Sequence, residues 1–159
     1  MAKVAAKSIL GEPAKYQGFY NGAATKVYNY KVGGTGFTEK AAKENGLIPV
    51  VGYAEVTTRF PILPGAEKIK VKLIADLNTR KIIGGQVVGS EGVTERIDLI
   101  TYAIQQKSTV DDIAMLSYAS QPYQTAFPAN NAMVMAAEEI LEKLKEQDKV
   151  YFDSSEKVV

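Results

Sequence analysis

The feature that constrains the fold most is a short apolar strand that continues through glycines directly into a helix. Residues 82–88 (IIGGQVV) are rich in β-branched side chains and are followed by Gly89-Ser90-Glu91-Gly92. Beyond these glycines, apolar residues recur at the spacing of one helical face: Ile97, Ile100, Tyr102, Ala103 and Ile104. A strand that leads into such a helix predicts a helix packed on a sheet.

Two further helices are predicted after this one. The first covers residues 109–116, where Ser108 or Thr109 can cap the exposed amides. Asp111 and Asp112 place negative charge at the positive end of its dipole. After a loop, Pro128 suits the first turn of the final helix. The apolar face of that helix is formed by Ala132, Met133, Met135, Ala136, Ile140, Leu141 and Leu144.

The chain ahead of residue 82 is predicted to consist mainly of strands. The ranges with the β-branched, aromatic or alternating pattern of strands are residues 25–32, 48–59 and 68–75. Residues 33–36 (GGTG) are predicted to end the first of these strands in a turn. Thr38 is a suitable N-cap for a short helix over residues 39–45, and Gly46 closes that helix.

This order of elements predicts the fold class and the division of the chain. Strands come first and helices last, which indicates an α+β fold with an antiparallel sheet of about four to five strands, covered by helices on one side. We expect residues 1–23 to hold a short helix and a linker, and residues 24–147 to form the domain. Residues 148–159 are polar and are predicted to form a C-terminal tail.

The composition excludes several classes of function. The chain has no Cys and no His, so it lacks a thiolate nucleophile, an imidazole base and the usual zinc ligands, and we expect no metal site. Its 19 basic and 18 acidic residues nearly balance, which argues against nucleic-acid binding. No apolar run approaches the roughly 20 residues that span a membrane. We therefore expect a cytoplasmic protein that binds neither nucleic acid nor membrane.

Two glycine-rich segments share features with phosphate-binding loops. Residues 33–36 precede a helix, but the helix is short and a third glycine of the dinucleotide fingerprint is missing, so a plain turn is favoured. Residues 84–89 have the glycine spacing of a P-loop, but Ser90 stands where the phosphate-binding lysine is required. Close packing of the backbone in a strand is the better interpretation.

One loop gathers polar aromatic residues between two helices. It contains Tyr118, Gln121, Pro122 and Tyr123, and loops held by a rigid frame often carry function. The alternative is that both tyrosine rings pack on the domain with their hydroxyls in water, and composition alone favours it. The methionines Met115, Met133 and Met135 are interpreted as core or interface residues.

Three segments together resemble a known family. They are residues 76–104 (DLNTRKIIGGQVVGSEGVTERIDLITYAI), residues 24–27 with 35–39 (ATKV and TGFTE), and residues 109–113 (TVDDI). In this order they are similar to the interface, or dimerisation, domain of the pyridine nucleotide-disulfide oxidoreductases. Residues 3–11 resemble the last helix of the flavin domain, which in that family directly precedes the interface domain.

The resemblance implies cofactors and partners that lie mostly outside this chain. FAD-binding and NAD(P)H-binding domains are expected upstream in the same polypeptide, and no cofactor is expected within this chain. The domain is expected to form a homodimer, with Phe127, Met133 and Met135 at its interface. The loop before the last helix, here residues 118–128, is expected to reach the partner's flavin and redox centre. Tyr118, Gln121, Pro122 and Tyr123 are thus candidate catalytic residues acting in trans.

Departures from the family pattern favour one branch of it. Gln121-Pro122 stands where the glutathione and lipoamide type carries His-Pro, and an amide cannot relay a proton as imidazole does. Residues 116–119 (LSYA) resemble the start of the "YAPP"-like loop of coenzyme A disulfide reductases and NADH oxidases, although residues 120–122 (SQP) depart from it. This resemblance makes Tyr118 the best candidate for a hydroxyl donor to a thiolate, flavin or substrate.

The resulting hypothesis is the C-terminal dimerisation domain of an FAD-dependent NAD(P)H oxidoreductase of the NADH oxidase or coenzyme A disulfide reductase type. Under this hypothesis the chain by itself is inactive, because the cofactors are bound elsewhere. The alternative hypothesis is a free-standing module that binds a small ligand with the loop of residues 118–127.

Overall fold

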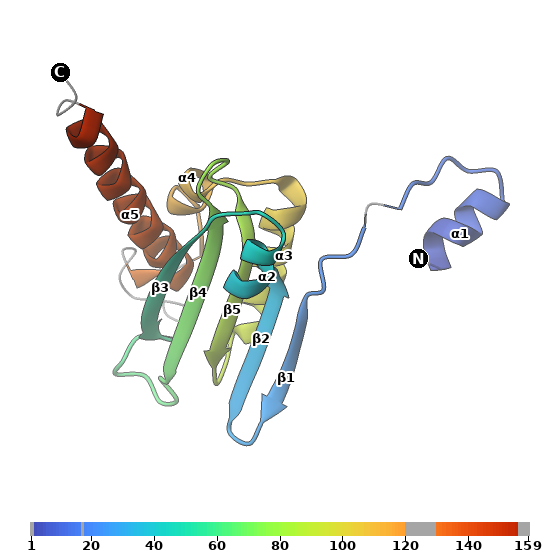
Figure 1. The fold of residues 1–159 in the computed structure, drawn as a ribbon. Helices are drawn as coiled ribbons and strands as arrows, with labels where there is room; N and C mark the ends of the chain where they lie inside the picture. The colour runs from blue at the N-terminus through green and yellow to red at the C-terminus, as the bar shows by residue number, and fades with distance from the viewer. Residues whose placement is uncertain (1, 17, 120–129, 156–159) are drawn as a thin grey trace.

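The computed structural model describes residues 2–16, 18–119 and 130–155, with side chains through Glu146 (Figure 1). Its strands are β1 (Ala23–Val27), β2 (Tyr30–Gly36), β3 (Pro49–Thr57), β4 (Lys68–Asp76) and β5 (Ile82–Gly89). Its helices are α1 (Ala2–Ile9), α2 (Glu39–Glu44), α3 (Val93–Gln106), α4 (Val110–Ala114) and α5 (Ala132–Ser155). The strands form one antiparallel sheet in the order β1-β2-β5-β4-β3.

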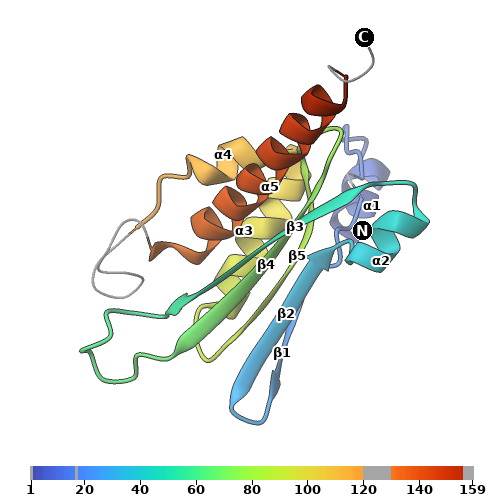
Figure 2. The same cartoon turned by 60° about the vertical axis from the view of Figure 1, so that its left-hand side comes forward.

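Helices cover one face of this sheet. α3 packs on β2 and β5, α5 packs on β3 and β4, and α4 lies against α5 (Figure 2). Among the described residues, the opposite face carries only the short helix α2 near one end. The predicted α+β fold with helices on one side is therefore confirmed.

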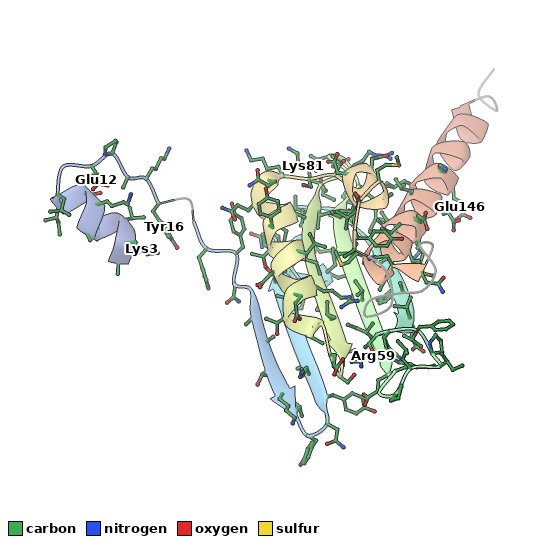
Figure 3. The ribbon with its side chains drawn as sticks, turned by 180° about the vertical axis from the view of Figure 1, so that it is seen from behind. Lys3, Glu12, Tyr16, Arg59, Lys81 and Glu146 are labelled. Carbon is green, nitrogen blue, oxygen red and sulfur yellow. The ribbon has the colours of Figure 1, made fainter. Side chains whose placement is uncertain are left out.

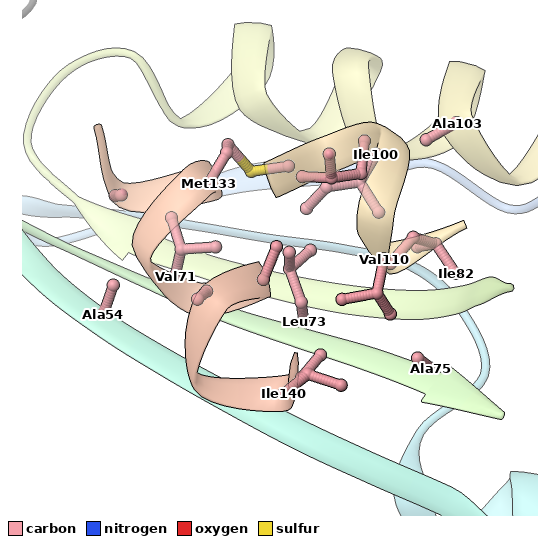
Figure 4. Close-up of a cluster of buried hydrophobic side chains, with 14 of the residues drawn as sticks. Ala54, Val71, Leu73, Ala75, Ile82, Ile100, Ala103, Val110, Met133 and Ile140 are labelled. Carbon is pink, nitrogen blue, oxygen red and sulfur yellow. The ribbon is translucent and has the colours of Figure 1, made fainter. Parts of the chain in front are cut away.

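The core lies between the sheet and the helical layer (Figure 4). Large fully buried side chains in this core include Ile69 and Leu73 on β4, Ile100 on α3, and Met133 and Ile140 on α5. Each such side chain contributes about 1.5–3 kcal/mol of burial free energy. The alternation on β4 that predicted this arrangement is confirmed, because Lys70 is exposed while its neighbours Ile69 and Val71 are buried.

The N-terminal part of the sheet differs from the prediction. The single strand predicted over residues 25–32 is a hairpin, in which β1 and β2 are joined at Tyr28 and Asn29. Tyr28 adopts a left-handed conformation with φ of 53°, which permits this tight turn. The turn predicted over residues 33–36 is also wrong, because these residues belong to β2: all four pair with β5, and Gly33 and Gly34 pair with β1 as well.

The predicted caps of the short helices are confirmed. The side-chain oxygen of Thr38 accepts a hydrogen bond of 3.2 Å from the N–H of Ala41 at the start of α2. At α4, the Thr109 hydroxyl accepts from the N–H of Asp112, and the Asp112 carboxylate accepts from the N–H of Thr109 at 2.7 Å. This reciprocal pair is a capping box, which satisfies two amides that the helix itself leaves unpaired.

The last helix differs from the prediction at both ends. It begins at Ala132, where the Asn131 side-chain oxygen accepts hydrogen bonds from the N–H groups of Met133 and Val134, at 2.9 and 3.3 Å. Pro128, predicted in its first turn, lies outside the described residues. The helix continues to Ser155, so much of the predicted tail is helical. On α3, Tyr102 was predicted on the apolar face but is 59% exposed.

An N-terminal arm, residues 2–22, leads into β1. It carries α1, none of whose side chains is buried (Figure 3). Lys7 and Glu12 form an ion pair of 3.2 Å across the end of this helix, where exposure makes its contribution small. The arm is attached to the domain near Tyr20, whose carbonyl accepts a hydrogen bond of 3.0 Å from the N–H of Gly36.

Candidate functional site

The structure describes only the beginning of the loop that carries the candidate catalytic residues. Tyr118 is half-buried, four residues beyond the end of α4. Gln121, Pro122, Tyr123 and Phe127 lie outside the described residues. The roles of these side chains therefore stay predictions.

The start of the loop is held firmly by α4. The Arg80 guanidinium, in the turn between β4 and β5, donates two hydrogen bonds to the Asp111 carboxylate, at 3.0 and 2.8 Å. The carbonyl of Arg80 accepts a hydrogen bond of 2.8 Å from the N–H of Val110. A bidentate pair of this kind fixes orientation as well as distance, so α4 is anchored on this turn. The loop that carries Tyr118 therefore begins at a fixed point.

The far side of the loop is anchored in the core. Met133, predicted at the dimer interface, is 2% exposed and belongs to the core of the chain itself. Met135 is half-buried and packs against that core. The loop thus runs between two fixed points, the end of α4 and the Asn131 cap of α5.

Two exposed apolar side chains stand on the helical layer. Met115, the C-cap residue directly after α4, is 85% exposed, and Tyr102 on α3 is 59% exposed. Tyr102 was predicted on the apolar face of its helix because it fits the helical spacing, and Met115 was interpreted as a core or interface residue. Only the three-dimensional position of each helix distinguishes a residue facing the sheet from one facing outward.

The open face of the sheet forms a shallow hollow of about 610 Å³. It is lined by apolar residues and by long charged side chains: Val32, Val88, Tyr53, Glu55, Lys70 and Lys72. The ammonium of Lys72 lies 5.4 Å from the centre of the Tyr53 ring, within the range of a cation–π contact. An apolar surface with an ordered set of charges can contact another protein surface.

The charges on this face are arranged in pairs. Glu55 forms ion pairs with both Lys68 and Lys70. Hydrogen bonds from these two lysines lower the pKa of Glu55 to about 2, and the bond from Lys68 has the larger effect. A hydrogen bond from Lys72 likewise lowers the pKa of Glu39 on α2. All of these carboxyls are therefore ionised at neutral pH.

The glycine-rich segments do not form a nucleotide cradle. Residues 33–36 and 84–89 lie in neighbouring strands that pair with each other, so their amides are used in the sheet. These two segments thus belong to the sheet and are not phosphate-binding loops. In the same part of the chain, no group of three or more acidic side chains could hold a metal ion.

None of the helices described is both long and apolar enough to cross a membrane.

Comparison with known proteins identifies the family. The family model described as the pyridine nucleotide-disulphide oxidoreductase dimerisation domain matches residues 23–141. An NADH oxidase from Methanocaldococcus jannaschii is 34% identical over 142 residues, which are 89% of this chain and 31% of that protein. A coenzyme A disulfide reductase from Staphylococcus aureus is 27% identical over 124 residues, which are 76% of this chain and 27% of that protein.

Solved structures agree with this result. The structure of an NAD-dependent persulfide reductase from A. fulgidus matches with a TM-score of 0.81 and 31% identity, over 88% of this chain and 26% of that chain. The chain spans less than a third of the length of each of these proteins. The predicted resemblance is confirmed, and this chain belongs to the family of pyridine nucleotide-disulphide oxidoreductase dimerisation domains.

Proposed function

We propose that this chain is the dimerisation part of an FAD-dependent NAD(P)H oxidoreductase of the NADH oxidase or coenzyme A disulfide reductase type. The family match and the names of the relatives support this assignment. In this proposal FAD and NAD(P)H are bound by other domains of the same polypeptide, because the chain spans less than a third of the length of these relatives. The chain's own work is to pair two subunits.

The helical layer is proposed as the surface that pairs. The observation that carries this proposal is Met115, an apolar side chain left 85% exposed at the end of α4. It lies three residues before Tyr118, at the start of the loop proposed to reach the partner subunit. Apolar and aromatic side chains that are exposed in one subunit are typical of the centre of an interface between two.

Sedimentation velocity over a range of concentrations tests the pairing. The chain is expected to sediment as a dimer, and Met115→Glu is expected to raise the dissociation constant by about tenfold or more, because a charge would be buried in the interface. Tyr28→Glu is the matched control, because Tyr28 is 92% exposed in the β1–β2 turn, away from the helical layer (Figure 1). A monomer at every concentration would contradict the proposal and favour the small-ligand module.

The loop is proposed to serve chemistry on the partner subunit. In this proposal the Tyr118 hydroxyl donates a hydrogen bond to a thiolate, flavin or substrate there, and Gln121, Pro122 and Tyr123 shape the same site. In the full FAD-containing polypeptide, Tyr118→Phe should lower kcat for NADH oxidation by roughly tenfold, with dimerisation unchanged. Equal kcat values for the native protein and Tyr118→Phe would show that the Tyr118 hydroxyl has no role in catalysis. This conclusion would hold whatever the sedimentation experiment shows about dimerisation.

A further inference from the structure

We infer that a second cavity in this domain binds a small amphipathic anion, an apolar molecule with one carboxylate. The cavity measures about 600 Å³ and lies where the ends of β2 and α3 and the start of β5 meet the N-terminal arm. It shares no lining residue with the hollow on the open face, and Tyr118 is not part of it. The inference is independent of the proposed function, since it concerns a site within one chain.

The floor of the cavity is apolar. It is formed by Phe37, Leu47, Ile83 and Ile104, all of which are only half-buried although they are large. Water against such a surface is released when an apolar group covers it, which favours a ligand with an aromatic or aliphatic body.

The arm forms one wall of the cavity. Phe19, Tyr20 and Asn21 line it from this side. The Tyr20 carbonyl accepts two hydrogen bonds, from the N–H of Gly36 at 3.0 Å and from the Thr35 hydroxyl at 3.1 Å. This side of the cavity is therefore held to β2 at Tyr20.

The charges of the cavity favour an anion. Lys81 and Lys107 both line it, and within the described ranges neither forms an ion pair. The acidic residue beside them, Asp76, is 2% exposed, and its oxygens accept hydrogen bonds from the N–H of Ile48 and from Thr79. Because the Asp76 carboxylate already accepts these hydrogen bonds, the ammonium groups of Lys81 and Lys107 are available to bind a carboxylate of the ligand.

The position of Lys107 supports this assignment. It ends α3 in the left-handed conformation, with φ of 59°, at a place where glycine is the usual residue. A lysine here costs backbone free energy that glycine would avoid, and such costs are often found at binding sites. Lys81, labelled in Figure 3, lines the same cavity.

Titration with naphthoate, followed by amide chemical shifts in NMR, tests the inference. Saturable shifts are expected at Phe37, Leu47, Ile83 and Ile104. The double variant Lys81→Gln/Lys107→Gln should bind naphthoate roughly tenfold more weakly. Glutamine keeps most of the side-chain length and can hold the backbone as lysine does, so the fold is expected to persist. Lys31→Gln, an exposed lysine of β2 outside the cavity, is the matched control.

A neutral ligand separates the contribution of the apolar body to binding from the contribution of the negative charge. Naphthamide has the same apolar body without the charge, so it should bind equally to the native chain and to the double variant. Three results would overturn the inference: no saturable shift, shifts centred on Val32 and Val88 of the open face, or the same naphthoate affinity in the double variant as in Lys31→Gln.

Discussion

The Glu139 carboxylate on α5 accepts a hydrogen bond of 2.7 Å from the backbone N–H of Tyr53 on β3. Four residues along the helix, the Lys143 ammonium donates a hydrogen bond of 2.8 Å to the carbonyl of Val51. β3 is an edge strand, and an edge strand presents unpaired donors and acceptors that other chains can bind. The ion pair of Glu139 with Lys143 on α5 therefore satisfies two backbone groups of β3 that another strand could otherwise bind.

Glu139→Ala should lower the free energy of unfolding by about 1–2 kcal/mol, because the Tyr53 amide loses its acceptor and Lys143 its partner. It should also increase self-association, since the backbone N–H of Tyr53 on the edge strand β3 is left without its acceptor. Urea denaturation and light scattering measure the two effects. Glu142→Ala, an exposed position on the same helix, controls for helix propensity, and equal stability of the two variants would contradict the prediction.

Asp76 should make the stability of the fold depend on pH. Burial alone raises the pKa of this carboxyl, but hydrogen bonds from Thr79 and from the N–H of Ile48 outweigh it, so the pKa lies below its ordinary value. A lowered pKa in the folded state stabilises the protein above the unfolded value of about 3.9, and this contribution is lost as the pH falls through the folded pKa.

Asp76→Asn should therefore lower the free energy of unfolding by about 1–3 kcal/mol at neutral pH. The difference from the native chain should shrink as the pH falls below about 3.9. Urea denaturation at several pH values measures this, with Asp98→Asn on the exposed side of α3 as the control. A difference that stays constant with pH would show that Asp76 acts through shape and not through its charge.

Gly52 allows α5 to approach β3. A Cβ atom at this position would lie 1.9 Å from the carbonyl oxygen of Ala136, a backbone atom that cannot move alone. Gly52→Ala should thus lower the free energy of unfolding by about 3 kcal/mol or more. At Gly34 a Cβ would meet nothing closer than 3.6 Å, so Gly34→Ala should be neutral or slightly stabilising. Thermal unfolding of both variants tests this, and similar losses in both would contradict it.

Glu55 should titrate far below an ordinary glutamate. Its pKa of about 2 follows from hydrogen bonds with Lys68 and Lys70, the larger effect coming from Lys68. NMR titration of the side-chain carboxyl carbon should show this midpoint, and Lys68→Gln should move it upward. An unchanged midpoint in Lys68→Gln would mean that the lysines do not hold this carboxylate.

The parts of the fold that depend on local chemistry could be predicted from the sequence. Thr109 was one of two predicted caps of α4, and the structure shows that it caps this helix together with Asp112, three residues along. The alternation of Lys70 with Ile69 and Val71 likewise fixed which side of β4 faces the core.

The parts of the fold that depend on contacts between residues far apart in the sequence could not be predicted. Gly33 was interpreted as part of a turn, but a Cβ there would lie 2.6 Å from Ile97 on α3, so the glycine is needed for close packing of a helix. The turn at Tyr28 carries no glycine or proline, which hid the hairpin. The second cavity is lined by five separate segments, and no local pattern indicates it.

The place of β5 in the sheet sets the order in which the domain can assemble during synthesis. β5 pairs with β2 on one side and β4 on the other, so it alone joins the N-terminal hairpin to the β3–β4 pair. While the ribosome is still making residues 37–81, the hairpin has no strand to dock on and its inner edge stays open. A nascent chain stalled before residue 82 would therefore expose that edge to its neighbours on the same polysome.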